Sequence, residues 1–189
     1  RPRRPLRADE AAHLRHRPAP GQDVLERLGH EAAAHQREVA PARQLKVLVF
    51  NLGEALMQPG GASDIALQPR DKITVFDLET NRSKLLEPVI ERLRMQASRE
   101  NRQKVVNITG NVRFPGSYPL TEGMSTRQLI ALAGGLNENA YNLSGEITRY
   151  SLDEQQRQQI HYIDVQLASA NQYALQEEDR LNIRRLPDW

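Results

Sequence analysis

The sequence predicts a mixed α+β fold made of short strands and a few short helices. Three observations carry this prediction. Short runs alternate between apolar and polar residues, as in "KITV" (72–75) and "VVNIT" (105–109), which is the period of a half-buried strand. One stretch, "EPVIERLRMQASREN", repeats its apolar residues at helical spacing,. Pairs of turn-forming Pro and Gly residues separate these runs.

The composition leaves room for one large or two small domains. The chain has 189 residues, of which 39% are hydrophobic and 26% are charged,. It contains no cysteine, which excludes a disulfide framework, a thiolate zinc site and a cysteine nucleophile. No run of about 18 apolar residues is present, so no transmembrane helix is expected. The N-terminus lacks the continuous apolar region of a signal peptide, and we expect the chain to be a piece of a larger protein.

The charge is unevenly distributed along the chain. Residues 1–44 carry nine Arg against six acidic residues, whereas the remainder carries 17 basic and 18 acidic residues. A protein that neutralises many phosphates needs its basic residues on the folded domain. The near-neutral balance of the remainder therefore argues against nucleic acid as the main partner.

Residues 1–44 are expected to be a weakly ordered leader. They contain five Pro, nine Ala, four of the five His and no aromatic residue, a composition that offers little core. A thin apolar stripe at Val24, Leu25 and Leu28 predicts one helix near 22–38,.

Residues 45–79 are expected to form a partial unit. The run from Leu45 reads as a strand that passes into a short turn, and "MQPGGAS" reads as a loop,. Ile73 and Val75 alternate with polar neighbours, which predicts a strand with these two residues buried.

A linker helix is expected within residues 80–103, at about 88–99. Pro88 suits the first turn of a helix, where its missing N–H is not needed. The residues on the apolar face are Val89, Ile90, Leu93 and Ala97.

Residues 104–189 show the clearest local signals. A strand from Val105 runs into a turn at Pro115 and Gly116,. Ser125 and Gln128 have the spacing of a capping box at the start of a helix,. The Gly134–Gly135 pair is expected to end this helix,. A hairpin around 153–158 and a final strand in "DRLNIRRL" follow.

The sequence contains an internal echo. "ALQPRDKITV" (66–75) and "ALQEEDRLNI" (174–183) share the frame A-L-Q-x-x-D-x-apolar-x-apolar. A repeat of this size suggests two copies of one small module. No counterpart of "GNVRFPG" or "AGGL" occurs before residue 45, so the first copy is expected to contain only its second half.

The segment "VNITGNVRFPGSYPLTEGMSTRQLIALAGGL", followed by "ITRY" and "ALQEEDRLNI", resembles the SLBB domain, the soluble-ligand-binding β-grasp. The resemblance covers 104–186 well and 45–79 in part, and it implies one complete and one partial β-grasp-like module joined by a helix. The residues that carry it are Gly110, Val112, Pro115, Gly116, Tyr118, Ala133, Gly134, Gly135, Leu136 and Asp179.

Tandem SLBB modules are typical of bacterial polysaccharide export proteins. The resemblance implies a non-enzymatic component of capsule or exopolysaccharide export, located in the periplasm or at the outer membrane. It implies a homo-oligomeric ring, contact with polysaccharide and with other export proteins, and membrane association through parts absent from this chain. No cofactor is expected.

Candidate ligand-binding residues lie near the Pro–Gly turn. Asn111 and Arg113 are suited to hydrogen bonds with sugar hydroxyls or uronate carboxylates, or they are solvated loop residues. Tyr118 is suited to stacking on a sugar ring, or it is a core residue. Asp71 and Asp179 are matched across the echo, and we favour turn-closing roles over ligand contacts because no second carboxylate has loop-ligand spacing.

Other site types have weak or no signals. A metal site is not expected, because the histidines have no nearby cysteine and few acidic neighbours; they are His13, His16, His30 and His35,. His161 alternates with apolar residues and is expected to face solvent. No catalytic motif or phosphate loop is present.

Three alternative functions remain open. SLBB modules also resemble domains beside DNA-uptake proteins, which would bind DNA in a strongly salt-dependent manner. A module of a redox complex and a glycan-cleaving enzyme are further alternatives, and the enzyme would require a suitably spaced carboxylate pair.

Overall fold

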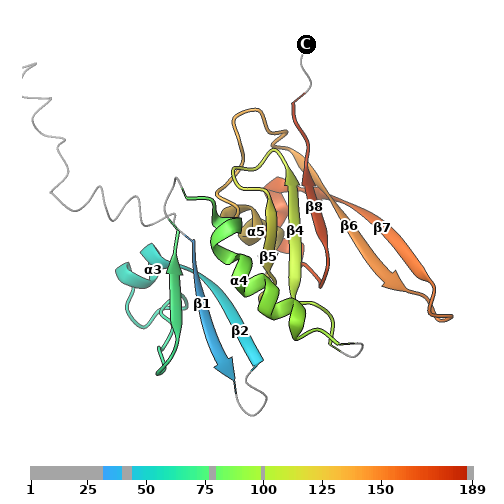
Figure 1. The fold of residues 1–189 in the computed structure, drawn as a ribbon. Helices are drawn as coiled ribbons and strands as arrows, with labels where there is room; N and C mark the ends of the chain where they lie inside the picture. The colour runs from blue at the N-terminus through green and yellow to red at the C-terminus, as the bar shows by residue number, and fades with distance from the viewer. Residues whose placement is uncertain (1–31, 40–43, 77–79, 99–100, 187–189) are drawn as a thin grey trace, which may run out of the picture.

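The computed structural model describes residues 32–39, 44–76, 80–98 and 101–186. These residues form a mixed α+β structure with two sheets, which confirms the expected fold class (Figure 1). The first sheet has the strand order β2-β1-β3, and the second has the order β5-β4-β8-β6-β7. Helix α4 (Arg82–Met95) runs between the two sheets (Figure 1).

The first sheet begins earlier in the chain than expected. Its central strand is β1 (Ala32–Val39), which pairs antiparallel with β2 (Gln44–Asn51) and with β3 (Lys72–Val75). The predicted helix near 22–38 is therefore wrong from residue 32 onward, and residues 22–31 lie outside the described residues. The prediction that residues 1–44 form a weakly ordered leader is likewise wrong for residues 32–39, which form β1. Alanine has a weak strand preference, but pairing on both sides outweighs it.

Two further expectations for the first sheet need correction. The predicted short turn after β2 is a helix, α3 (Leu52–Met57), which begins because the Asn51 side chain accepts a hydrogen bond from the Glu54 N–H at 3.1 Å,. The predicted burial of Ile73 and Val75 is also wrong, since their side chains are 39% and 47% exposed. The strand itself is present, but its apolar side is uncovered.

Helix α4 begins six residues before the predicted start. Its N-cap is Asn81, whose side chain accepts a hydrogen bond from the Lys84 N–H at 3.3 Å. Pro88 lies inside the helix and not in its first turn. Both Pro88 and Lys84 are exposed, so the hydrogen bond that Pro88 cannot donate falls on the solvent side.

The second sheet follows the predicted order of elements. Helix α5 (Thr126–Leu132) starts with the predicted capping box, in which Ser125 and Gln128 bond each other's backbone N–H. It ends at Leu132, and Gly134, just after the C-cap Ala133, has a left-handed φ of 85°,. The remaining elements are β4 (Val105–Gly110), β5 (Gly116–Pro119), β6 (Ser144–Leu152), β7 (Gln158–Gln166), the 3-10 helix η2 (Leu167–Gln172) and β8 (Arg180–Ile183).

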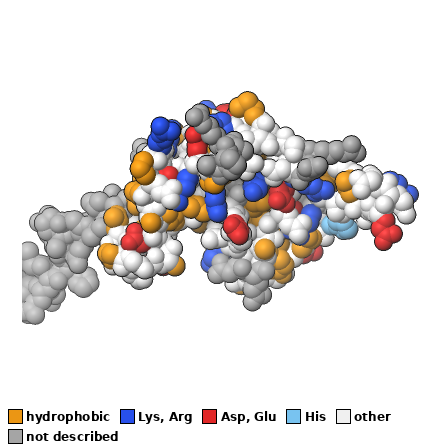
Figure 2. All heavy atoms as spheres, turned by 90° about the horizontal axis from the view of Figure 1, so that it is seen from below, with side chains coloured by type: hydrophobic (Ala, Val, Ile, Leu, Met, Phe, Trp, Pro, Cys, Tyr) orange, Lys and Arg blue, Asp and Glu red, His pale blue; other side chains and the backbone are white. Residues whose placement is uncertain are grey.

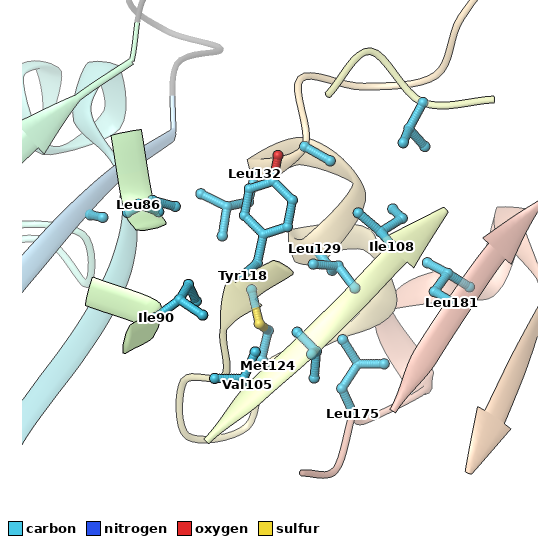
Figure 3. Packing of buried hydrophobic residues seen from close by; sticks show 14 of the residues in the cluster. Leu86, Ile90, Val105, Ile108, Tyr118, Met124, Leu129, Leu132, Leu175 and Leu181 are labelled. Carbon is cyan, nitrogen blue, oxygen red and sulfur yellow. The ribbon is translucent and has the colours of Figure 1, made fainter. Parts of the chain in front are cut away.

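One hydrophobic core joins the two sheets through α4. Leu86 and Ile90 of α4 lie beside Tyr118 of β5, which faces Leu132 of α5 (Figure 3). The same cluster includes Ala34, Leu45 and Val47 of the first sheet. At the start of β5, Gly116 approaches α4 so closely that an added Cβ would lie 2.6 Å from the Ser83 Cβ. The helix is therefore packed against both sheets.

The two sheets repeat one pattern of strand pairing. In the first sheet, His35 lies opposite Ile73, and in the second, Ile147 lies opposite Leu181. When His35 is aligned with Ile147 and Ile73 with Leu181, the register of β1 with β3 matches that of β6 with β8. In the same alignment, the β1–β2 hairpin matches the β6–β7 hairpin. Helices α3 and η2 each start directly after the hairpin. The echo seen in the sequence thus extends over four elements.

Candidate functional site

The described residues contain no group of three or more His, Asp or Glu side chains placed to hold a metal ion. His35 is fully buried in β1, and its Nε2 lies 2.8 Å from Asp71 Oδ2. His161 is exposed as expected, with its Nε2 2.8 Å from the Ser151 Oγ. His13, His16 and His30 lie outside the described residues.

Asp179 closes the turn before β8. Its buried carboxylate accepts hydrogen bonds from Arg149 Nε at 2.9 Å, from Arg149 Nη2 at 2.7 Å and from the Gln176 N–H at 2.8 Å. Arg149 also donates to the Ala174 carbonyl at 3.1 Å. The hydrogen bonds from Arg149 of β6 tie the turn to β6, and the pairing with Asp179 raises the pKa of Arg149.

Asp71 repeats this arrangement before β3. It accepts hydrogen bonds from Arg37 Nε at 3.1 Å, from Arg37 Nη2 at 2.7 Å and from the Gln68 N–H at 2.7 Å. Arg37 also donates to the Ala66 carbonyl at 2.7 Å. The hydrogen bond from Arg37 is the main cause that lowers the pKa of Asp71. Both matched aspartates are thus engaged within the fold, as turn-closing residues are.

Tyr118 does not line a site. Its side chain has no exposed surface, and its hydroxyl donates to the Phe114 carbonyl at 2.6 Å. Burial raises the pKa of Tyr118,. The prediction that Tyr118 contacts a ligand is wrong, because a fully buried ring cannot stack on a sugar; the alternative core position is the one observed.

Asn111 and Arg113 lie just beyond β4, near the Pro–Gly turn. Arg113 is exposed, and its guanidinium lies 5.8 Å from the centre of the Phe114 ring. Asn111 is held through its backbone, with its N–H donating to the Ile183 carbonyl at 2.8 Å. Ligand binding by Asn111 and Arg113 stays a prediction.

The motif residues near this turn hold the backbone in place. Gly110 has a φ of 84°, and an added Cβ would lie 2.0 Å from the Ile183 carbonyl oxygen. At Gly134, an added Cβ would lie 2.8 Å from the Phe114 ring. Gly135 also has a positive φ, of 89°, but faces open space. Pro115 precedes the first residue of β5, as a turn residue should,.

A polar groove of about 310 Å³ crosses the second sheet at the opposite end of β4. We call it the sheet groove. Its floor comes from neighbouring strands, since Asn107 of β4 lies opposite Arg180 of β8. Its walls come from α4, the segment before β4, and the hairpin. The lining residues are Arg94, Gln103, Val105, Asn107, Tyr150, Gln158, Glu178 and Arg180.

The sheet groove offers groups suited to a polar ligand. The exposed guanidinium of Arg180 forms no ion pair with the described residues, and the half-exposed Tyr150 supplies a ring face. Asn107, Gln103 and Gln158 add amide donors and acceptors. A ring face beside amides and a planar cation matches the chemistry of sugar hydroxyls and carboxylates.

Sequence reasoning missed the sheet groove because its residues come from five separate stretches of the chain. Strand alternation carries a partial signal: Asn107 lies between the buried Val106 and Ile108, and Arg180 precedes the buried Leu181. These polar residues had to face away from the core. Their convergence depends on the parallel pairing of β4 with β8, which no local pattern specifies.

A second hollow of about 490 Å³ lies between the first sheet and the turn after β5. Its apolar floor includes Leu45, Val47 and Leu93. On its rim, Lys46 Nζ lies 3.7 Å from Glu122 Oε2. The rim of this hollow thus carries charges of both signs.

Comparison with known families agrees with this picture. Residues 105–150, from β4 through most of β6, match the model of the SLBB domain family, which confirms the resemblance over this segment. SLBB domains bind ligands and occur in polysaccharide export and DNA-uptake proteins, in periplasmic or extracellular settings. A search of curated proteins finds no match to the chain. In the described part of the chain, no helix has the length and apolar character needed to cross a membrane.

Proposed function

We propose that this chain is a non-enzymatic component of bacterial polysaccharide export that contacts the glycan through the sheet groove. The observation that carries the proposal is the groove itself, which places Tyr150, Arg180 and Asn107 together on the SLBB-type sheet. A component of this kind acts in the periplasm or at the outer membrane, on a capsular polysaccharide or an exopolysaccharide.

The charge distribution favours a glycan over nucleic acid. Glu178 lies in the same groove as Arg94 and Arg180, and Arg94 is paired with Glu91 at 2.8 Å. A carboxylate beside the ligand is compatible with sugar hydroxyls but repels a phosphate backbone. Basic and acidic side chains are also interspersed on the face shown in Figure 2, without the continuous basic stripe of a nucleic-acid receptor.

The proposal includes an assembly role. The repeated strand register supports two β-grasp-like modules, one complete and one partial, joined by α4. Such modules stack into a homo-oligomeric ring that other export proteins contact. Membrane association comes from parts outside this chain, and no cofactor or metal takes part.

A genetic experiment tests this function. The full-length gene is deleted in its source bacterium, and the strain is complemented with the wild-type gene, with Y150A/R180A, or with K84A. Lys84 is an exposed cation on α4, away from the groove, and serves as the matched control. Surface polysaccharide is stained, and DNA uptake is scored in the same strains.

The export proposal expects loss of surface glycan in the deletion strain, with normal DNA uptake. K84A should restore the glycan fully, and Y150A/R180A should restore it poorly at equal protein level. Normal surface glycan after deletion overturns the export proposal, and loss of DNA uptake would promote the DNA-uptake alternative. Full rescue by Y150A/R180A would remove the groove from the proposal while leaving export in place.

A further inference from the structure

One row of residues crosses all five strands of the second sheet. Ser117 of β5 lies opposite Asn107 of β4, and Asn107 lies opposite Arg180 of β8. Arg180 lies opposite Thr148 of β6, which lies opposite Tyr162 of β7. Paired positions of neighbouring strands place their side chains on the same face of a sheet. The five side chains therefore form one line across the strands, which we call the cross-strand row.

The cross-strand row continues the sheet groove toward the hairpin. Asn107 and Arg180 line the groove, and the buried neighbours of Asn107, Val106 and Ile108, face the core on the other side of the sheet. Strands β4, β8, β6 and β7 lie side by side (Figure 1). Adjacent strands are about 4.8 Å apart, so the three steps from Asn107 to Tyr162 span about 14 Å. A line of this length accommodates more than one linked sugar ring.

The start of the row presents hydrogen-bond donors. The Ser117 hydroxyl donates to Asn107 Oδ1 at 2.7 Å, and Arg94 Nη2 donates to the Ser117 Oγ at 3.5 Å. The acceptor of the Asn107 amide is thus engaged, which leaves its NH2 group to donate to a ligand. Beside it, the exposed guanidinium of Arg180 forms no ion pair with the described residues. Two groups that donate therefore lie next to each other on neighbouring strands.

One end of the groove presents an acceptor. Glu178 belongs to the turn before β8 and lines the groove, and its N–H donates to the Val105 carbonyl at 2.9 Å. A carboxylate of a ligand matches the donors of Asn107 and Arg180, whereas the Glu178 carboxylate accepts from hydroxyls. A uronic acid carries both a carboxylate and hydroxyls. A phosphate backbone would meet the repulsion of Glu178 without hydroxyls to satisfy it.

Tyr162 provides an aromatic ring at the other end of the row. Its side chain is 68% exposed, and an exposed tyrosine offers both an apolar ring face and a polar hydroxyl. In the next row along the strands, Glu146 lies opposite the exposed Asp164. Glu146 is paired with Arg184 at 3.0 Å, but Asp164 would repel an acidic chain. Such a chain is therefore favoured on the row and disfavoured beside it.

We propose that the cross-strand row binds an acidic glycan, with a uronate carboxylate on Asn107 and Arg180 and a further sugar ring on Tyr162. The glycan chain lies across the strands of the second sheet and not along them. Tyr162 is then a specificity-determining residue outside the lining of the groove. This inference rests on the proposed function, because it names the class of glycan and a second contact at the same site.

A binding experiment with matched glycans tests the inference. Isotope-labelled full-length chain is titrated with tetrasaccharides of galacturonate, of mannuronate and of hyaluronan, and amide shifts are followed by NMR. The methyl ester of each tetrasaccharide is the control, because it keeps the rings and hydroxyls but loses the charge. We expect saturable shifts at Asn107, Arg180 and Tyr162 with at least one acid. Its ester should bind about tenfold more weakly, because the charge-assisted hydrogen bonds are lost.

Variants separate the two contacts. R180Q should bind acid and ester equally weakly, because the carboxylate loses its cation. Y162A should weaken the binding of both forms by a similar factor, because ring stacking does not depend on charge. K84A should bind as the wild type does. Circular dichroism checks the fold of each variant, and Arg180 and Tyr162 are exposed enough for their substitution to be tolerated.

The outcomes distinguish this inference from the proposed function. Equal binding of acid and ester by the wild type, or binding of none of the acids, overturns the acidic class of glycan. Unchanged affinity in Y162A overturns the course of the chain across the strands. The export function itself fails only if the deletion strain keeps normal surface glycan, whatever the titrations show.

Discussion

Arg149 holds the buried carboxylate of Asp179 through two hydrogen bonds, from Nε at 2.9 Å and from Nη2 at 2.7 Å. The Asp179 side chain has no exposed surface, and that of Arg149 is 19% exposed. The pair therefore links β6 to the turn before β8. Arg37 and Asp71 form the same link in the first sheet.

Removal of Arg149 is expected to destabilise the protein strongly. R149A leaves a buried carboxylate without its cation, and breaking such a pair costs about 3 kcal/mol. Urea unfolding followed by circular dichroism measures the loss. R157A is the control, because the Arg157–Asp153 pair lies at the exposed hairpin tip, where ion pairs contribute about 0.5 kcal/mol. Equal losses in the two variants would contradict a structural role for the buried pair.

Acidification is expected to weaken the first sheet through Asp71. The pKa of Asp71 is lowered in the folded protein, chiefly by the hydrogen bond from Arg37. Ionised Asp71 therefore stabilises the fold above its unfolded pKa of about 3.9, and this contribution is lost as the pH falls below about 4. The urea midpoint should drop between pH 4.5 and pH 2.5, and it should drop less in R37M.

The acid dependence that Asp153 contributes at the hairpin tip must be separated from that of Asp71. The pKa of Asp153 is also lowered, mainly by a backbone hydrogen bond from Arg157, and its acid dependence has the same sign. The comparison of R37M with the wild type is therefore made in a D153N background. An unchanged acid sensitivity in R37M would rule out Asp71 as its source.

Gly110 is expected to tolerate no side chain. In G110A the new Cβ would meet the Ile183 backbone carbonyl at 2.0 Å, so β4 and β8 must separate at this end. G135A provides the matched control, because Gly135 has a similar positive φ but open space around it. We expect G135A to cost about 1 kcal/mol through backbone strain alone and G110A to cost at least twice that amount in urea unfolding. Similar losses would show that the close approach to Ile183 does not limit the position.

Alkaline pH is expected to destabilise the protein through Tyr118. Its pKa is raised by burial in the folded state, whereas an unfolded tyrosine ionises near pH 10. The protonated phenol stabilises the fold below pH 10, and stability falls as the pH rises above that value. Y118F should lose about 1 kcal/mol at pH 7 with its hydrogen bond to Phe114, but it should lose less stability than the wild type between pH 9.5 and pH 11. Parallel pH profiles for the two proteins would exclude this mechanism.

Local signals in the sequence predicted the second sheet well. The capping box at Ser125 and the glycine at the end of α5 depend on residues within a few positions of one another, so they can be recognised without the fold. The hairpin between β6 and β7 is equally local. The start of α4 was predicted too late because Pro88 was placed in the first turn. A proline is compatible with a helix interior when its missing hydrogen bond faces solvent.

The first sheet was harder to predict because its strands are specified by their neighbours. The run from Ala32 to Val39 has little strand preference of its own, yet it lies between β2 and β3. Arg37 and Arg149 are equivalent in the two sheets, but they are not separated by the same number of residues as Asp71 and Asp179. A search at one fixed period therefore finds the matched aspartates and misses the matched arginines.

The close contact between Gly116 and Ser83 gives one position control over the relative orientation of the two sheets. Strand β5 and helix α4 meet at a place where only a hydrogen atom fits, and α4 also packs against the first sheet. A methyl group at residue 116 would have to push the helix outward, and the first sheet would move with it. Substitution of this glycine would thus change how the two sheets are oriented relative to each other, while leaving the hydrogen bonds within each sheet intact.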